Sequence, residues 1–291
     1  MITTILSIAV SAVFLGSIYV LLGVGMSLLY GVSQTINLAH GDLMIIGSYL
    51  TFVFVSAVGL APLWLLIIAP ILMGIFGVVL YKTGGFSRIL IRPSSRTDRE
   101  FTTMIMTFAL AWIFSNLLAA IFTANFQSYP SLDIQIFASS ILPFRKLITI
   151  VISLSLLGII WLIIKKTWIG LAIRCVFDDN EASKLMGVNV DIVHFFIFFI
   201  AFFTAGTAGT LYSMNFSMTP YLGTEFTIIA IVVAIIGGIG SVKGALVGGF
   251  MVALTETLVL FFVSPLLKIA FVYALFVAIL LIRPSGLFKN M

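Results

Sequence analysis

The sequence predicts an all-α polytopic membrane protein, a helical bundle of eight or nine transmembrane helices that forms one domain over residues 1–291. Hydrophobic side chains make up 62% of the chain and charged ones 9%, whereas soluble globular proteins have roughly 45–50% and about 25%. Nine apolar runs have, or nearly have, the length that a helix needs to cross a bilayer core about 30 Å thick. None of the runs alternates with period two, which disfavours an outer-membrane β-barrel.

The apolar runs follow one another with short polar separators. They cover approximately residues 5–30, 43–60, 62–82, 101–123, 147–164, 194–214, 226–240, 245–264 and 267–282. The second run is short and polar at its start, and the chain has eight spans if this run only dips into the membrane. The first run has no basic residue before it and no small-residue cleavage pattern after it. We therefore expect it to be retained as an anchor rather than removed as a signal peptide.

The positions of Lys and Arg predict the orientation, because short cytoplasmic loops collect basic residues. If the loop 82–100 is inside, the loop 165–193 and the C-terminus are inside as well. Twelve of the fifteen basic residues then lie inside: Lys82, Arg88, Arg92, Arg96, Arg99, Lys165, Lys166, Arg174, Lys184, Lys243, Arg283 and Lys289. Arg145, Lys146 and Lys268 remain outside. Nine spans place the N-terminus outside, and eight would place it inside.

The few polar residues exclude several classes of function. Ten acidic and fifteen basic side chains cannot coat a soluble particle of this size, which argues against nucleic-acid binding. The single Cys175 allows neither an internal disulfide nor a cysteine zinc cluster. His40 and His194 occur without HExxH or GxSxG spacing. We expect no metal site, no cofactor bound by this chain and no catalytic residues.

One pentapeptide occurs twice. Leu90-Ile91-Arg92-Pro93-Ser94 closes the third predicted span, and Leu281-Ile282-Arg283-Pro284-Ser285 closes the ninth. Internal duplication of the kind found in transporters is one interpretation. The other is a common stop signal, in which a basic residue and a proline follow an apolar run.

A dense polar patch precedes the second run. It contains Gln34, Thr35, Asn37, His40 and Asp42, with Gly41 as a residue that would let the backbone turn. In one interpretation Asn37 or Asp42 simply caps the next helix at the membrane surface, with His40 solvated beside it. The other interpretation makes Asn37, His40, Gly41 and Asp42 part of a translocation path or gate, because polar groups inside a membrane are costly.

Small residues recur between the seventh and eighth runs. If one helix runs through, Gly240, Gly244 and Gly248 form one stripe, and Gly237, Ser241, Ala245 and Gly249 form a second. Such stripes allow close helix packing. A broken helix near a substrate path, with Gly238, Gly240 and Ser241 lining it, is compatible with the same residues. A phosphate-binding loop is strongly disfavoured, because such a loop needs Gly-Lys followed by Ser or Thr and here Lys243 precedes Gly244.

Glu256 stands alone within the eighth run, and Glu225 opens the seventh. Glu256 is a candidate proton or cation site on a path. The structural alternatives are a protonated carboxyl or a hydrogen bond to a polar neighbour such as Asn116.

The loop at about 174–191 is the most polar stretch and predicts a short cytoplasmic helix. Asp178 to Asn180 offer its start, Glu181 lies in the first turn, and Gly187 offers the stop. Ala182, Leu185 and Met186 fall on one side. Docking into a groove of a soluble partner is one interpretation. Contact with the lipid surface is the other, which the acids near the start disfavour.

These residues resemble a known family. Glu181-Ala182-Ser183 followed by Gly187 is similar to the loop by which bacterial ABC importer permeases engage their ATPase, although Ser183 replaces the usual alanine and a downstream proline element is absent. The wider pattern resembles the permeases of branched-chain amino-acid ABC importers, and the LivH type more than the LivM type. It comprises Tyr30-Gly31, Ile36 to Asp42, Gly237 to Ser241, Gly244-Ala245, Gly248-Gly249, Glu256, Arg283-Pro284 and Gly286-Leu287.

The resemblance implies a heterodimer with a homologous permease, two cytoplasmic ATPase subunits that use ATP and magnesium, and an external solute-binding protein, all at the bacterial plasma membrane. It implies ATPase coupling through Arg174, Asp178, Asp179, Glu181, Ala182, Ser183 and Gly187. Branched-chain amino acids lead as substrates, and urea, short-chain amides and other amino acids follow. Two rival classes are an ion-coupled secondary transporter, with Glu256 and Asp42 as its candidate sites, and a passive channel. The channel is disfavoured because the chain has no Asn-Pro.

Overall fold

The computed structural model describes residues 2–91, 96–129 and 143–288. Apart from an isolated antiparallel bridge between Gln127 and Met218, the regular elements in these ranges are all helical. Nine helical segments in the described residues are long and apolar enough to cross a bilayer. The predicted fold class, an all-α polytopic membrane bundle, is confirmed.

The spanning helices agree with the predicted runs to within a few residues at most ends. They are α1 (Ile2–Ser33), α2 (His40–Val58), α3 (Pro62–Thr83), α5 (Arg96–Phe122), α6 (Phe144–Lys166), α9 (Val190–Ser213), α10 (Gly223–Gly237), α11 (Val242–Phe262) and α12 (Lys268–Ile282). Two 3₁₀ turns, η1 (Pro220–Leu222) and η2 (Pro265–Leu267), precede α10 and α12. Three shorter helices complete the described chain: α4 (Phe86–Ile91), α7 (Trp168–Asp178) and α8 (Asn180–Leu185).

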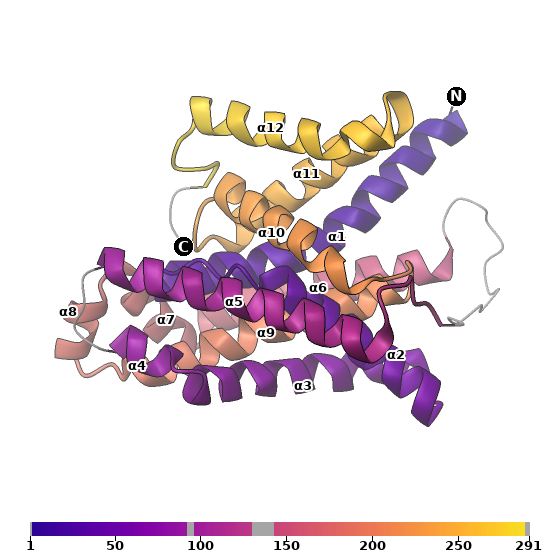
Figure 1. Ribbon diagram of the computed structural model, residues 1–291. Helices are drawn as coiled ribbons and strands as arrows, with labels where there is room; N and C mark the ends of the chain where they lie inside the picture. Colours follow the sequence, from indigo (N-terminus) through magenta and orange to yellow (C-terminus); the bar gives the residue numbers. More distant parts are fainter. Residues whose placement is uncertain (1, 92–95, 130–142, 289–291) are drawn as a thin grey trace.

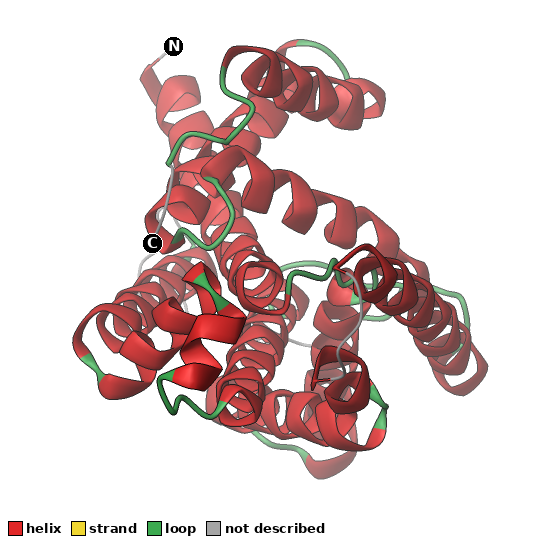
Figure 2. Ribbon diagram, turned by 90° about the vertical axis from the view of Figure 1, so that its left-hand side faces the viewer, coloured by secondary structure: helices red, strands yellow, loops and turns green. Residues whose placement is uncertain are grey.

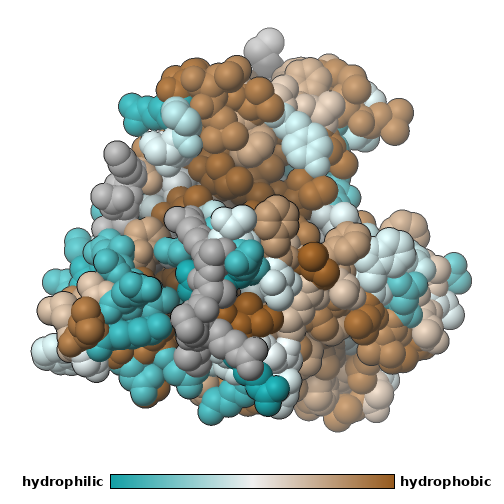
Figure 3. All heavy atoms as spheres, turned by 60° about the vertical axis from the view of Figure 1, so that its left-hand side comes forward, coloured by the Kyte–Doolittle hydropathy of each residue, from teal (hydrophilic) through white to brown (hydrophobic). Residues whose placement is uncertain are grey.

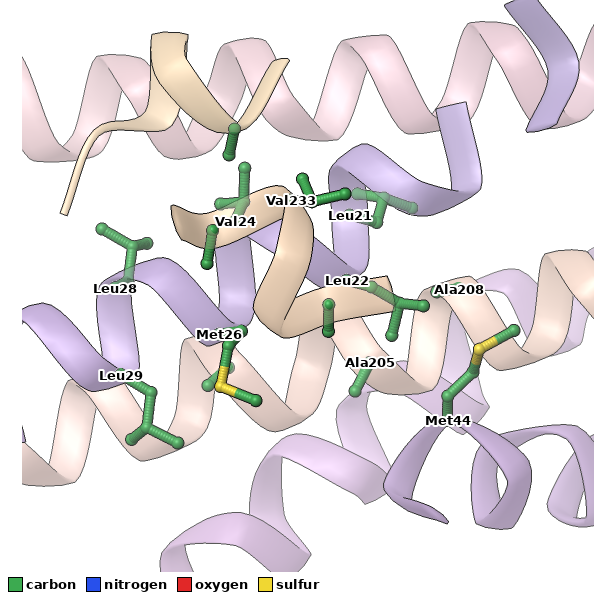
Figure 4. Close-up of a cluster of buried hydrophobic side chains, with 14 of the residues drawn as sticks. Leu21, Leu22, Val24, Met26, Leu28, Leu29, Met44, Ala205, Ala208 and Val233 are labelled. Carbon is green, nitrogen blue, oxygen red and sulfur yellow. The ribbon is translucent and has the colours of Figure 1, made fainter. Parts of the chain in front are cut away.

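Helix α1 is the central element of the bundle. It packs against α6, α9, α10 and α11, and from Gly16 onward its residues are almost all buried, on every side of the helix. Figure 4 shows Leu21, Leu22 and Met26 of α1 among Met44 of α2, Ala205 and Ala208 of α9 and Val233 of α10. This arrangement explains why the first run is apolar all round, since a helix buried on all sides has no polar face.

The second apolar run is a full span. Helix α2 has 19 residues from His40 onward and packs against α9, α10 and α3. Its polar first turn is buried in protein, where a polar group meets other protein groups instead of lipid. Of the two predicted counts, nine spans and not eight fit the length and composition of the described helices.

The outer helices expose apolar side chains. Helices α5 and α12 each bury a small share of their apolar window, and α12 touches the rest of the bundle mainly through α11 and α10. Figures 1 and 2 show the α11–α12 hairpin standing away from the layer that contains α3, α5 and α9. Exposed surface of this kind faces lipid or another subunit.

Polar groups gather at one end of the bundle. Helices α4, α7 and α8 lie there, together with the end of α6 and the start of α9 (Figure 1). Figure 3 shows hydrophilic side chains concentrated in that region and hydrophobic ones over the flanks. We call this the α8 end. Predicted cytoplasmic loop residues such as Lys166 and Lys184 lie at it.

Several predicted features fall outside the described residues or differ from the structure. Arg92, Pro93, Ser94 and Lys289 lie outside the described residues. Leu90 and Ile91 end the separate helix α4, whereas Leu281 and Ile282 end the span α12. The two copies of the pentapeptide thus follow different elements, and the prediction that the first copy closes the third span is wrong.

Candidate functional site

Helix α8 has a defined start and stop. The Asp179 side chain caps it, since Oδ1 accepts hydrogen bonds from the Glu181 N–H at 2.9 Å and the Ala182 N–H at 3.0 Å. Asp178, one of the predicted start residues, instead ends α7. Gly187 follows the helix at φ +83°, a left-handed conformation that favours glycine. The predicted short helix therefore exists, with Asp179 as its cap.

Helix α8 exposes two large apolar side chains, beside the charged Glu181 and Lys184. Leu185 is 90% exposed and Met186 is 82% exposed, with the exposed Ala182 one turn before them. Ser183 faces the protein, and its hydroxyl donates to the Asp179 carbonyl oxygen at 2.7 Å. Two large apolar side chains exposed at the polar end of a membrane protein are typical of a surface that a partner covers.

Helix α7 was not predicted from the sequence, and it links α8 to the bundle. Thr167 caps it by accepting a hydrogen bond from the Gly170 N–H at 3.1 Å. Arg174 lies on α7, and its Nε–H donates to the Gly170 carbonyl oxygen at 3.4 Å. Arg174 and Asp178 therefore sit on the helix before α8 and not on α8 itself.

The ring of Phe177, two residues before the α8 cap, reaches the interior. A Cβ atom built on Gly31 of α1 would lie 2.8 Å from this ring, and one built on Gly240 would also meet it. Gly31 and Gly240 themselves are adjacent, because the same Gly31 Cβ would be 3.1 Å from the Gly240 Cα. One side chain thus connects the segment that carries α8 to both α1 and the glycine-rich turn.

The glycine-rich segment is a break between two helices. Helix α10 ends at Gly237 and α11 begins at Val242, with Gly238 at φ +98° and Gly240 at φ +79° between them. The two continuous stripes expected for one helix are therefore wrong, because residues with positive φ interrupt the helix. Ser241 caps α11 by accepting a hydrogen bond from the Gly244 N–H at 3.0 Å. The broken helix fits this geometry, and it is compatible with close packing of the glycines on either side of the break.

Hydrogen bonds join the break between α10 and α11 to two other parts of the chain. The Gly240 N–H donates to the Ser27 hydroxyl of α1 at 2.8 Å. The N–H of Leu287 donates to the Ile236 carbonyl at 2.9 Å, and that of Phe288 to the Gly237 carbonyl at 3.1 Å. These bonds satisfy carbonyl groups that the end of α10 would otherwise leave without partners.

The packing glycines lie at close approaches of backbones. A Cβ on Gly244 would overlap the carbonyl group of Gly237, so α10 and α11 touch through these two glycines. A Cβ on Gly248 would lie 2.8 Å from the Val233 carbonyl oxygen, and one on Gly249 would lie 2.9 Å from the Val20 nitrogen. Gly237, Gly244 and Gly248 therefore serve the α10–α11 contact, and Gly249 serves the contact with α1.

The polar patch before α2 is buried. His40 is fully buried beside α1, which contradicts the interpretation that it is solvated. The Asn37 Oδ1 accepts from the Ala39 N–H at 3.0 Å. Gly41 lies inside the first turn of α2 and forms no separate turn, contrary to expectation; its N–H donates to Thr227 Oγ1 at 2.8 Å. The absence of a side chain lets α2 touch α10 there, because a Cβ on Gly41 would overlap the Gly223 carbonyl.

Asp42 connects this patch to a groove. The Ser115 hydroxyl of α5 donates to Asp42 Oδ1 at 2.7 Å. Ser115 and Thr227 also line a groove of about 350 Å³ between α5 and α10. Its other polar residues are Asn116, Tyr221 and Thr224, and its apolar wall includes Phe108, Trp112 and Ile231. Mostly apolar walls with a few polar groups are typical of sites for small ligands.

Glu256 belongs to a four-residue polar cluster. The Tyr19 hydroxyl of α1 donates to Glu256 Oε2 at 2.6 Å, and Lys268 Nζ of α12 lies 3.4 Å from Glu256 Oε1. Lys268 also pairs with Glu225 of α10 at 2.7 Å. Asn116, suggested as a partner of Glu256, instead donates to the Trp112 carbonyl, so that suggestion is wrong. The cluster joins α1, α10, α11 and α12.

The predicted site residues thus fall into three regions, of which the buried patch from Asn37 to Asp42 beside the groove is one. Helix α8, Phe177 and the glycine break lie toward the α8 end. The Glu256 cluster lies toward the other end, with Tyr212 near the end of α9 among the residues that line an adjoining cavity. The sequence did not predict the contacts that Tyr19, Ser115, Phe177 and Lys268 make in these regions. A basic residue at the very start of the ninth run was the one available signal, for Lys268.

Comparison with known proteins gives a consistent result. The family model described as "Branched-chain amino acid transport system / permease component" matches residues 8–280. The chain is 30% identical to the high-affinity branched-chain amino acid transport system permease protein LivH of Salmonella typhimurium and to that of Escherichia coli K12, over 95% of this chain and 93% of each relative. It is 25% identical to the corresponding permease protein BraD of Pseudomonas aeruginosa, over 96% and 94%. No solved structure matches the chain.

Proposed function

Because this chain belongs to the family of branched-chain amino acid transport system permease components, we propose that it translocates branched-chain or other hydrophobic neutral amino acids as the permease subunit of an ABC importer. In this proposal an external solute-binding protein delivers the amino acid. Two cytoplasmic ATPase subunits hydrolyse ATP with magnesium, and this chain itself is not an enzyme. A homologous permease subunit completes a heterodimer in the plasma membrane.

The observation that carries the proposal is the exposed apolar pair Leu185 and Met186 at α8, in a chain that matches permeases over nearly its whole length. A permease without ATPase chemistry has to receive conformational work through contacts whose strength differs between states. Helix α8 is capped at Asp179, stopped at Gly187 and joined through α7 and Phe177 to the bundle. It therefore suits the role of the coupling contact with an ATPase subunit.

The same proposal sets the orientation. If α8 contacts a cytoplasmic ATPase, the α8 end faces the cytoplasm, together with the loops that hold most of the basic residues. Nine spans then place the N-terminus outside and the C-terminus inside. The Glu256 cluster lies in the outward half of the membrane in this orientation.

The groove between α5 and α10 is the proposed path on this subunit. Its polar groups come from both α5 and α10 and interrupt an otherwise apolar surface, and Asp42 lies directly behind Ser115. A solute with a charged or polar head and an aliphatic side chain fits such a surface better than a small polar solute does. Glu256 is already paired with Lys268 and Tyr19, which disfavours it as the coupling-ion site of a secondary transporter.

The experiment has two parts. The tagged chain is purified in mild detergent with the proteins encoded beside it, and we expect the two ATPase subunits and a second permease to co-purify. The complex is then reconstituted in vesicles with the binding protein, and uptake of labelled leucine is compared with uptake of labelled urea. ATP-dependent leucine uptake supports the proposal. Purification without any ATPase, or uptake driven by an ion gradient alone, would refute it.

A further inference from the structure

A cavity of about 300 Å³ lies at the α8 end, between the last turn of α6, helix α7 and the start of α11. Three cationic side chains line it from three separate elements: Lys165 of α6, Arg174 of α7 and Lys243 of α11. Trp161, Gly240 and Ser241 complete its wall. We call it the basic pocket.

The three cations have no acidic partner in the described part of the chain. None of the three lies within 4 Å of a carboxylate oxygen of a described residue, in contrast to Lys268. Lys165 and Lys243 instead lie on the ring of Trp161, with Nζ atoms 5.0 Å and 5.6 Å from its centroid. Like charges brought together in this way repel one another, and an anion in the pocket would relieve that repulsion.

The pocket also offers hydrogen-bond donors suited to an oxyanion. It includes the start of the 21-residue helix α11, where the first N–H groups of a helix carry partial positive charge. The guanidinium of Arg174 presents donors in a planar fork that matches a phosphate. Cations, a helix start and an indole ring together favour a phosphate over a carboxylate side chain.

The surface next to the pocket indicates which molecule carries the phosphate. Ile159 and Leu162 of α6, one turn before the cations, are about half exposed, so this flank has the character of a lipid-facing surface. Trp161 lies between this apolar flank and the cationic residues of the pocket. Trp168 follows just beyond the end of α6 and is 85% exposed. Tryptophan at such a boundary is typical of the level of lipid headgroups. An apolar flank that ends in a phosphate-binding pocket is complementary to a phospholipid, with acyl chains along the flank and the headgroup in the pocket.

We propose that the basic pocket binds the headgroup phosphate of an anionic phospholipid whose acyl chains lie along α6. The site rests on the orientation given under the proposed function, in which this end meets the cytoplasmic leaflet. Basic pockets between helices on that side are where anionic headgroups bind. Since Gly240 and Ser241 form one wall, the bound lipid also contacts the α10–α11 break.

The test uses quenching of Trp161 fluorescence by brominated lipid in the purified full-length chain. Trp64, Trp112 and Trp168 are replaced by Phe so that Trp161 alone reports. Micelles of a neutral detergent are titrated with brominated phosphatidylglycerol or with brominated phosphatidylcholine. The pocket variant carries Lys165→Gln, Arg174→Gln and Lys243→Gln. The control carries Lys82→Gln, Lys166→Gln and Lys184→Gln, which remove the same charge at the same end but outside the pocket.

We expect phosphatidylglycerol to quench Trp161 at much lower concentration than phosphatidylcholine. Each neutralised cation in the pocket should lower the apparent association constant about fivefold, and all three about 100-fold. The control should change it less than about threefold. Equal quenching by both lipids, or equal effects of the two triple variants, would overturn the proposal. Displacement of the lipid by inorganic phosphate at equal concentration would assign the pocket to a soluble anion instead.

This outcome is separable from the proposed function. Lipid binding is measured on the permease chain without transport or ATP. If the pocket variant keeps its lipid affinity but no longer co-purifies with the ATPase subunits, the pocket is part of the ATPase contact and the lipid assignment is wrong. If lipid binding behaves as expected and no ATPase co-purifies, the lipid site stands and the importer proposal fails.

Discussion

Replacing Gly244 by alanine tests how closely α10 and α11 approach. The added Cβ would overlap the carbonyl oxygen of Gly237 and lie 2.6 Å from the carbonyl carbon and 3.1 Å from the Cα atom. The distance of 2.6 Å to the carbonyl carbon is about 1 Å shorter than the optimal separation of ~3.5 Å between nonbonded carbon atoms. All three atoms belong to the backbone, so no side-chain rotation relieves the overlap and the helices have to separate.

The expected cost is the cost of overpacking a well-packed core, about 1–3 kcal/mol for a single added methyl group. Separation would also strain the bonds by which Leu287 and Phe288 are held to the end of α10. We expect Gly244→Ala to lower the free energy of unfolding by about that amount. Unfolding is followed by far-ultraviolet circular dichroism as SDS replaces a mild detergent in mixed micelles.

Gly158→Ala is the matched control. Gly158 lies in α6, and a Cβ there has no atom within 4 Å outside its own helix. Alanine favours the helix over glycine by about 1 kcal/mol, so this variant should be as stable as the original or more so. If Gly244→Ala unfolds at the same SDS fraction as Gly158→Ala, the close contact between Gly237 and Gly244 is not as the structure has it.

Three further predictions concern topology, the Glu256 cluster and the link to α8. Cys175, half-buried on α7, should react with a membrane-impermeant maleimide in inside-out vesicles and not in intact cells; labelling of intact cells would reverse the orientation. Lys268→Met leaves the buried Glu256 with Tyr19 alone and should destabilise the chain by about 1–3 kcal/mol in the same unfolding assay, less than for a fully buried pair because Lys268 is partly exposed. Adding Glu256→Gln should restore the part of the loss that comes from the unpaired Glu256 but not the part from Glu225, and no recovery at all would contradict the pairing. Phe177→Ala removes the ring that touches Gly31 and Gly240 and should raise the ATP hydrolysed per solute transported; an unchanged ratio would show that Phe177 has no part in coupling.

The sequence was sufficient for the spans, because bilayer thickness and the cost of polar groups in lipid leave few ways to arrange nine apolar runs. It also predicted the stop of α8, since Gly187 follows a short polar helix and glycine readily adopts positive φ. Local chemistry decides both features. Neither depends on which helices become neighbours.

The contacts between distant segments could not be predicted. Tyr19 and Glu256 are 237 positions apart, and nothing in either neighbourhood indicates that α1 passes beside α11. Helix α7 was not predicted because its 11 residues are too few to cross a bilayer and lie within a polar loop, where the apolar Trp168 and Leu171 are exposed while Ile173 and Val176 pack on the bundle. The glycine stripes were ambiguous for a related reason, since the same spacing suits a continuous helix and a break. Only the positive φ values at Gly238 and Gly240 distinguish them.

The central claim is that ATP hydrolysis reaches this permease through α8, and the exposed pair Leu185 and Met186 tests it directly. Both side chains are more than four-fifths exposed, so Leu185→Asp with Met186→Asp should leave folding and pairing with the second permease intact. Leu266→Asp, at a residue that is 92% exposed beyond the opposite end of α11, is the control.

The measurement is ATPase activity of the reconstituted complex with and without loaded binding protein. We predict that the stimulated ATPase activity of the double variant falls more than about tenfold. Two apolar side chains that an ATPase subunit covers contribute at least about 1.4 kcal/mol together to the contact. Leu266→Asp should retain the stimulated activity. Full stimulation and normal transport with Leu185→Asp and Met186→Asp both present would contradict the claim.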